Sequence, residues 1–275
     1  FYTIEIFPVM YKIHPAKLDP GFYRNINGAL ATAYGLLTAS EKIDLPIVYA
    51  GYPITPASEV LHLLAALKQF DVSAVQTEDE IAAITMALGA AYGGSLGITG
   101  SSGPGIALKT EALNLAVMTE LPLIVFDFMR SGISTGMPTK TEQGDLLLAL
   151  FGRPSDSHVI VLAPSSASDC FWISIEAVRL ATKYMTPVVV LSEGFLVNSS
   201  EPWKLPDIKK IPKIKSPFRK KVEGFLPYKR NKETLARDWV KVGTEGLEHT
   251  IGGLEKTDEN GGITQELSLI HISEP

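Results

Sequence analysis

The sequence has only one cysteine in 275 residues, and this scarcity excludes several kinds of site. A single thiol, Cys170, forms no internal disulfide and cannot by itself hold an iron–sulfur cluster or a cysteine-bound zinc ion. Cys170 lies in an apolar helical pattern, so we expect it to be a small core residue. A chain without disulfides is expected in the cytoplasm.

Long apolar runs are also missing, since none approaches the roughly 20 residues of a membrane-spanning helix. The start, Phe1 to Glu5, has no basic segment of the signal-peptide kind, and no initiator Met, so we expect an incomplete chain. Neither sign of charge dominates, because 25 basic and 30 acidic residues give a net charge of -5. We therefore expect neither nucleic acid nor a membrane as partner.

What the sequence does contain is an alternation of strand-like and helix-like segments. Two of the strands, 123–126 and 188–191, are continuously apolar, as parallel strands covered on both faces are. The alternation predicts an α/β fold with a doubly wound, mainly parallel sheet and helices on both faces. The predicted strands are 46–50, 72–76, 95–99, 122–128, 158–163 and 187–192, and the predicted helices are 27–42, 56–69, 78–93, 106–119, 142–151 and 166–184.

The composition changes after residue 200. Five prolines and many lysines occur between Glu201 and Tyr228, and no apolar period survives. We expect residues 201–265 to form an extended linker over a surface with solvated charges, or else a basic patch for an acidic partner. The last ten residues, 266–275, resemble translated sequencing-adapter sequence, and we expect them to be a non-native tail.

A Pro-x-x-Pro turn, Tyr52-Pro53-Ile54-Thr55-Pro56, joins a predicted strand to a predicted helix. Open α/β sheets bind ligands at this end of their strands. Pro56 suits the first position of the helix with Thr55 as its N-cap, which would present a hydroxyl or a nearby amide to a small anion. The alternative is a capped helix start without a ligand.

Three consecutive carboxylates, Glu78, Asp79 and Glu80, precede a helix rich in alanine. Glu78 and Asp79 are explained as complements of the helix dipole. Glu80 differs because residues 81–84 are apolar, which favours a half-buried carboxyl group that shares a proton with a ligand nitrogen. The small side chains beside it would let an aromatic ring approach.

A glycine-rich turn, Ser102-Gly103-Pro104-Gly105, lies between a strand and a helix. Glycine permits close approach of the backbone to a ligand, and the helix that follows offers free N–H groups. The turn has neither the lysine of a P-loop nor the spacing of a dinucleotide-binding motif. Taken alone, it is explained as a tight connection between strand and helix.

A long polar loop begins at Arg130, directly after a buried strand, and continues through Thr139 to Asp145. Arg130 would point into the same crevice as Thr55, and a guanidinium group is the usual fork for a substrate carboxylate. Long loops in compact domains tend to carry function. The alternative is that Arg130 pairs with a structural acid.

Together these four segments resemble the alpha subunit of the 2-oxoacid:ferredoxin oxidoreductases, most closely the 2-oxoglutarate type. The resemblance runs from about Asn25 to Asp207. It implies that residues 25–200 form a pyrimidine-binding domain for thiamine diphosphate. Residues 80–105 are more distantly similar to the corresponding domain of acetolactate synthase-type enzymes.

The resemblance also implies roles for individual residues. Glu80 would contact the aminopyrimidine ring and share a proton with its nitrogen. The 2-oxoacid would be held by Thr55, Arg130 and Thr139, and the cofactor site would further include Tyr52, Pro53, Ser102, Gly103, Pro104 and Gly105. The implied reaction is the oxidative decarboxylation of a 2-oxoacid, with 2-oxoglutarate favoured, to an acyl-coenzyme A with electrons passed to ferredoxin.

Departures from the family pattern imply a partner. The sequence has no Gly-Asp-Gly…Asn segment for a diphosphate and its Mg²⁺, and no cysteine set for a [4Fe–4S] cluster. The resemblance assigns these to a beta subunit, so we expect a hetero-oligomer in which this chain supplies half a site and binds no metal. Residues 1–24 would be the remnant of an upstream gamma-type domain or a linker, and 201–265 would lead to a missing second domain. The family's Gly-Gly-Pro-Ser is here Ser131-Gly132-Ile133-Ser134.

Two other classes of protein stay open. One is a structural subunit without cofactor, and the other is a thiamine diphosphate enzyme of the decarboxylase or acetolactate type that does not use ferredoxin. A diphosphate-binding segment elsewhere in the full-length gene would favour the second.

Overall fold

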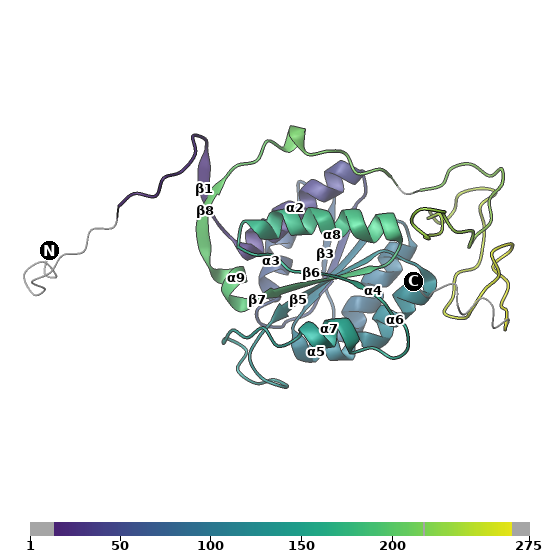
Figure 1. The fold of residues 1–275 in the computed structure, drawn as a ribbon, viewed down its shortest axis with the longest axis horizontal. Coiled ribbons are helices and arrows are strands. Elements are labelled where there is room, and N and C mark those ends of the chain that lie inside the picture. Colours follow the sequence, from purple (N-terminus) through teal and green to yellow (C-terminus); the bar gives the residue numbers. More distant parts are fainter. Residues whose placement is uncertain (1–13, 217, 266–275) are drawn as a thin grey trace, which may run out of the picture.

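The fold is built on a six-stranded parallel sheet, seen near the centre of the computed structural model in Figure 1. The structure describes residues 14–216 and 218–265, so the predicted tail 266–275 and the start of the predicted upstream remnant lie outside the described residues. The strand order is β3-β2-β4-β5-β7-β6, and every neighbouring pair is parallel. The predicted doubly wound parallel sheet is confirmed. The strands are β2 (Ile47–Gly51), β3 (Val72–Gln76), β4 (Leu96–Ser101), β5 (Leu123–Met129), β6 (Ile160–Leu162) and β7 (Pro187–Glu193).

Helices cover both faces of this sheet, as Figure 1 shows. One face carries α2 (Gly28–Ile43), α3 (Ser58–Ala66) and α8 (Asp169–Tyr184). The other face carries α4 (Glu80–Tyr92), α5 (Gly103–Leu108), α6 (Thr110–Thr119) and α7 (Leu146–Phe151). None of the helices in residues 14–216 and 218–265 is both long enough and apolar enough to cross a membrane.

The central strands are apolar over most of their length because each of their faces meets a helical layer. In β5, Ile124, Phe126 and Phe128 pack into the core beneath α2 and α8, whereas Leu123 and Val125 pack into the core beneath α4 and α6. Alternate side chains of a strand point to opposite faces, so a strand buried on both sides is apolar on both faces over most of its length, with Asp127 as the exception in β5. This explains the two continuous apolar runs in the sequence.

The strand order places a switch point between β2 and β4. The chain leaves β2 for β3 on one side and then returns past β2 to form β4 on the other side. At such a reversal the loops after the two strands diverge and leave a crevice at the carboxyl edge of the sheet. The two loops concerned begin at Tyr52 and Ser102.

Several boundaries differ from the expected ones. The predicted helix 106–119 is two helices, because α5 already begins at Gly103 and the chain bends at Lys109 before α6. The predicted N-cap at Thr55 is wrong: α3 begins at Ser58, follows Ala57 and has no side-chain cap. The Ser58 hydroxyl instead accepts from the Ile54 amide at 2.9 Å and donates to the Ile54 carbonyl at 3.0 Å.

Two short strands that the sequence pattern did not predict lie outside the main sheet. β1 (Tyr23–Asn27) pairs antiparallel with β8 (Ser200–Lys204), and Asn27 faces Ser200. Asn27 also caps α2, since its side chain accepts from the Leu30 amide at 2.8 Å. The short helix α9 (Gly194–Asn198) links β7 to β8. Segments before and after the sheet are thereby joined.

We call residues 205–216 and 218–265 the C-terminal segment. Apart from the 3₁₀ helix η1 (Ile208–Lys210) it has no regular element among the described residues, and it runs from the α2 side across to the α6 side (Figure 1). It does not lie wholly in solvent: Trp239 is only 1% exposed, and its ring lies 4.7 Å from that of Phe218, tilted by 48°. The division of the chain into domains stays a prediction.

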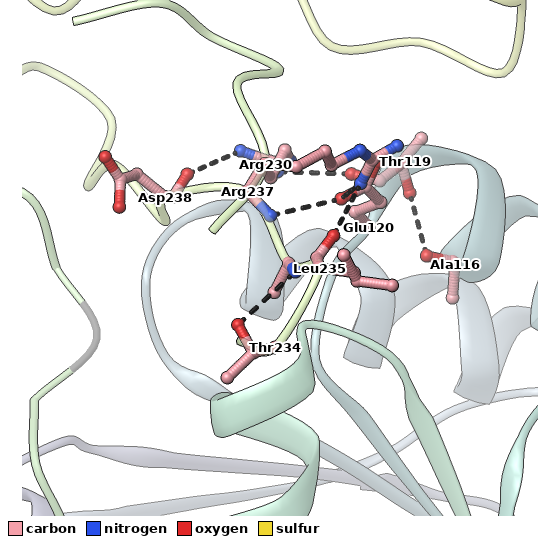
Figure 2. Close-up of polar contacts among 9 residues, drawn as sticks. Ala116, Thr119, Glu120, Arg230, Thr234, Leu235, Arg237 and Asp238 are labelled. Atoms are coloured by element: carbon pink, nitrogen blue, oxygen red, sulfur yellow. Dashed lines mark hydrogen bonds and ion pairs between the residues drawn. The ribbon is translucent and has the colours of Figure 1, made fainter. Parts of the chain in front are cut away.

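Figure 2 shows how this segment is attached to the end of α6. Arg237 is buried, and its Nη2 donates to the Thr119 carbonyl at 3.1 Å. Its backbone amide donates to Glu120 at 3.4 Å, and Glu120 also pairs with Arg230. Cations at a helix C-terminus satisfy unpaired carbonyls and complement the helix dipole. The attachment therefore stabilises both the helix end and the segment.

Candidate functional site

Tyr52 and Ser101 lie close together at the switch point, at the carboxyl edge of the sheet. The sheet register pairs Ala50 with Thr99, so the residues that follow these two reach the carboxyl edge together. The Tyr52 hydroxyl and the Ser101 Oγ lie 2.8 Å apart, and both side chains are buried. Ser101 was not among the predicted site residues, because its position at the end of a strand is known only once the strand boundaries are.

Gly105, in the first turn of α5, lies against the same two side chains, Tyr52 and Ser101. A Cβ atom at this position would lie 2.1 Å from the Ser101 Oγ, 2.2 Å from the Tyr52 hydroxyl and 3.0 Å from the Glu80 Cγ. Only glycine leaves room for these three side chains to converge. The structure therefore brings together three of the predicted cofactor residues, Tyr52, Glu80 and Gly105.

Glu80 is the first residue of α4, and its side chain does not cap the helix, because the preceding residue Asp79 does. Asp79 is the N-cap, and its carboxylate accepts from the Ala82 amide at 2.8 Å, as a complement of the helix end should. Glu80 is partly exposed beside Tyr52. Burial raises the pKa of the Tyr52 hydroxyl and the Glu80 carboxylate raises it further, whereas the hydrogen bond with Ser101 lowers it. Tyr52 thus remains a neutral hydrogen-bonding group next to Glu80.

Lys109 is a buried cation in this cluster that was missed in the sequence. Its exposed fraction is 0%, and its Nζ donates to the Glu80 carbonyl at 2.6 Å. The same Nζ lies 5.2 Å from the centre of the Tyr52 ring. Burial lowers the Lys109 pKa to about 7, against the opposing effect of Glu80 and Asp79. A lysine in a helical pattern is ordinarily exposed, so the sequence carried no signal for it.

Arg130 reaches the turn after β2, as predicted, but contacts backbone. Its Nη1 donates to the Thr55 carbonyl at 2.9 Å. Its Nε is buried and has no partner among the described residues, and none of the described ion pairs joins Arg130 to an acid. A buried guanidinium donor without an acceptor is unfavourable unless a ligand supplies one. Arg130 therefore has a buried donor, unpaired among the described residues, near Thr55, whose side chain is exposed.

The predicted site residues Thr139 and Pro53 are both exposed. Thr139 is exposed on the loop after β5, which is closed by the amide of Ser131 donating to the Lys140 carbonyl at 2.9 Å. In the part of the chain that the structure describes, no hydrogen bond joins the Thr139 side chain to Thr55 or Arg130. The structure thus does not bring Thr139 together with the other two predicted substrate residues.

The turn Ser102–Gly105 is partly helical, since Ser102 is the N-cap of α5 and Pro104 lies in its first turn. The Ser102 Oγ is buried without a partner among the described residues. A Cβ atom on Gly103 would lie 2.8 Å from the Asp145 carboxylate. The turn therefore packs against the polar loop after β5 as well as against Tyr52.

A second buried carboxyl group, Asp127, was also missed in the sequence. It lies within β5 and faces Asp145. Burial raises the pKa of Asp127 well above its usual range, and the Asp145 charge raises it further. The pKa of Asp145 is also raised by burial, so two carboxyl groups of raised pKa lie where β5 meets the end of the loop that carries Thr139.

The residues in the crevice fit one end of a heterocyclic cofactor rather than a metal. A carboxyl group, a neutral phenol and a hydroxyl converge there on the backbone of Gly105. Among residues 14–216 and 218–265, no group of three or more His, Cys, Asp or Glu side chains is arranged to hold a metal ion.

Comparison with known proteins is consistent with this geometry. Residues 42–268 match the family model described as pyruvate flavodoxin/ferredoxin oxidoreductase, thiamine diphosphate-binding. The 2-oxoglutarate oxidoreductase subunit KorA of Mycobacterium tuberculosis is 56% identical over 96% of this chain and 40% of its own length. The 2-oxoglutarate synthase subunit KorA of Archaeoglobus fulgidus is 37% identical over 76% of this chain and 57% of its own.

A solved structure is similar over nearly the whole chain. It is the 2-oxoglutarate:ferredoxin oxidoreductase from Magnetococcus marinus with 2-oxoglutarate, coenzyme A and succinyl-CoA bound, with a TM-score of 0.82 and 33% identity over 96% of this chain. This chain covers 46% of that one, and it spans about half the length of the curated relatives named above. The predicted family is confirmed: the chain belongs to the thiamine diphosphate-binding pyruvate flavodoxin/ferredoxin oxidoreductase family.

Proposed function

We propose that the chain is part of the alpha subunit of a 2-oxoacid:ferredoxin oxidoreductase. The reaction is the oxidative decarboxylation of a 2-oxoacid to an acyl-coenzyme A, with electrons passed to ferredoxin. The observation that carries the proposal is the convergence of Glu80, Tyr52 and Gly105, together with the buried Nε of Arg130, which has no partner among the described residues. The names of the relatives favour 2-oxoglutarate as the substrate.

In this proposal the crevice holds the aminopyrimidine end of thiamine diphosphate. When bound, the cofactor supplies the carbon nucleophile and the electron sink that a 2-oxoacid requires. Glu80 holds a proton at its carboxyl group against the ring nitrogen, and Tyr52 keeps the adjoining wall neutral and dry. Pro53, Ser102, Gly103 and Pro104 would complete the wall around the ring.

The 2-oxoacid would lie between the cofactor and the loop after β5. Arg130 would donate its free Nε to the substrate carboxylate, while its Nη1 stays on the Thr55 carbonyl. Thr55 and Thr139 are assigned to the same carboxylate and carbonyl head. Because both threonine side chains are exposed, closure of the site around them would require the partner subunit or movement of the loop.

The remaining parts of the site would belong to other subunits. With Cys170 as its single thiol, the chain cannot hold a [4Fe–4S] cluster by itself. We place the cluster and the Mg²⁺ of the diphosphate on a beta subunit, and ferredoxin and coenzyme A among the partners of the hetero-oligomer. A cytoplasmic location remains part of this proposal.

The test is to co-express the full-length gene with its immediate downstream neighbour and to assay the purified complex. The assay is 2-oxoglutarate- and coenzyme A-dependent reduction of a viologen dye, with and without thiamine diphosphate. Reduction that requires the cofactor supports the proposal, and replacement by pyruvate decides the substrate. A complex that binds thiamine diphosphate and holds its clusters but reduces no dye with any 2-oxoacid would leave the non-ferredoxin enzyme or the structural subunit.

A further inference from the structure

The buried amino group of Lys109 contacts the main chain of Glu80 rather than the open crevice. Its Nζ donates to the Glu80 carbonyl at 2.6 Å and lies 5.2 Å from the centre of the Tyr52 ring. A lysine with an exposed fraction of 0% is rare, because burying an ammonium group is costly unless the group is paired. A stabilising or functional gain must therefore offset that cost here.

Lys109 occupies a bend that suits this contact. It is both the C-cap of α5 and the N-cap of α6, with φ −89° and ψ −4°. It therefore belongs to neither helix and connects the two. Its long side chain crosses from this bend to the first residue of α4. One side chain thereby connects the glycine-rich turn, the helix that carries Glu80 and the tyrosine after β2.

We propose that Lys109 is a positioning residue for the cofactor: it holds the Glu80 main chain and the Tyr52 ring in the geometry that lets the Glu80 carboxyl group meet the aminopyrimidine. The inference rests on the proposed function, since it assumes the role of Glu80. The titratable groups that face Lys109 are Glu80 and Asp79 at the start of α4 and Tyr52 at the end of β2. Because its pKa is about 7, the charge that Lys109 presents to them changes near neutral pH.

The test uses the complex from the co-expressed full-length genes. The Kd of thiamine diphosphate is measured by calorimetry on the cofactor-free complex, and the turnover of the loaded complex is measured in parallel. Lys109→Met keeps the length of the side chain and removes its charge and donors. We expect it to raise the Kd and to lower kcat by about tenfold or more, with the 2-oxoacid KM within about twofold. Lys109→Arg keeps the cation and should recover most of the loss, and Lys68→Met, an exposed lysine, is the matched control.

A double-mutant cycle separates positioning from simple loss of packing. If Lys109 acts through Glu80, Lys109→Met should change the Kd in the natural protein but by less than about twofold in the Glu80→Gln background. An equal change in both backgrounds would overturn the proposal. Normal turnover of the Glu80→Gln complex would instead reject the proposed role of Glu80. If Glu80→Gln is inactive but Lys109→Met has a normal Kd and normal turnover, only the role of Lys109 is rejected.

If the Lys109→Met variant does not assemble into a complex, the Lys109→Arg complex still tests the role of Lys109. Arginine stays charged at all accessible pH values, so the change in Kd around pH 7 that comes from Lys109 should be absent from this variant. A Kd of Lys109→Arg raised by about tenfold or more at every pH would overturn the proposal, because a cation at this position would then not suffice to hold Glu80.

Discussion

At the scale of single residues, the candidate site is defined by the polar groups that Glu80 and Arg130 bring to the carboxyl edge of the sheet. The Glu80 carboxylate does not cap α4, because Asp79 is the N-cap of this helix. Arg130 keeps a free Nε because the acceptor of its Nη1 is a backbone carbonyl and not an acid. The placement of these two residues at the carboxyl edge of the sheet was predictable from the sequence, since each follows a parallel strand, whereas their roles stay predictions.

The first prediction concerns Glu80→Gln in the assembled complex. The amide cannot hold the proton that Glu80 is proposed to share, so we expect turnover to fall by roughly 10²–10⁴-fold while assembly is unchanged. The exposed neighbour Glu78→Gln is the matched control and should behave as the natural protein does. Activity of Glu80→Gln within a few-fold of normal would show that Glu80 is not the catalytic carboxyl group.

The second prediction concerns Arg130→Ala, which removes both the contact with Thr55 and the free donor. Loss of a charge-assisted hydrogen bond should cost about 1.5–3 kcal/mol of transition-state stabilisation, seen as a lower kcat/KM for the 2-oxoacid. Arg179→Ala, which removes an exposed arginine paired with Glu176, should leave kcat/KM unchanged. An unchanged value for Arg130→Ala would place Arg130 outside the substrate site.

The third prediction is the pH dependence of stability that Lys109 causes. Its pKa is about 7 in the folded chain and returns to its ordinary value, 10.5, on unfolding. Between these values the unfolded chain binds more protons, so the free energy of unfolding should rise with pH by up to about 1.4 kcal/mol per unit. Urea unfolding of Lys109→Met at several pH values should lack this component of the slope, and a slope equal to that of the natural chain would contradict the assignment.

At the scale of helices and strands, the sequence predicted the pattern well and the starting points of helices less well. The bounds of β3 agree with the prediction, whereas α3 and α7 are shorter than the predicted helices. The helix starts depend on contacts that no local pattern shows, such as the pairing of Ser58 with Ile54. For the same reason the glycine-rich turn was predicted as a loop, although its last three residues already belong to α5.

A prediction at this scale concerns the close contact between Gly105, after β4, and Tyr52, after β2. Gly105→Ala would place a methyl group within 2.2 Å of the Tyr52 hydroxyl, so the turn or the tyrosine must move. We expect weaker thiamine diphosphate binding and a lower melting temperature. Gly89→Ala is the control: it lies in α4 with nothing within 4 Å of its Cβ position, so it should stabilise the chain by about 0.4–1 kcal/mol.

At the scale of the whole molecule, the parallel sheet and its two helical layers were predictable, but the course of the C-terminal segment was not. Its sequence is rich in proline and lysine and has no period, so it indicated a solvated linker. The structure buries Trp239 and Arg237 from this segment against the body of the fold, through contacts between residues more than a hundred positions apart. Such long-range contacts leave no mark on local composition.

The attachment shown in Figure 2 gives a prediction for this scale. Arg237→Met should remove the hydrogen bond to the Thr119 carbonyl and cost about 1.5–3 kcal/mol. We expect faster amide hydrogen exchange over residues 228–239, while exchange in the central sheet is unchanged. The exposed Lys229→Met should exchange as the natural chain does, and protection of 228–239 in Arg237→Met equal to that of the natural chain would contradict the anchoring role.

The pairing of β1 with β8 has a consequence for how such a chain is accommodated in longer proteins. Because Asn27 faces Ser200, the polypeptide enters and leaves the sheet at neighbouring points. A module whose two connections are adjacent can be inserted between other domains without forcing them apart, and such sites tolerate insertion and permutation. We therefore expect that a different order of flanking domains would leave the sheet and the geometry of the site unaltered.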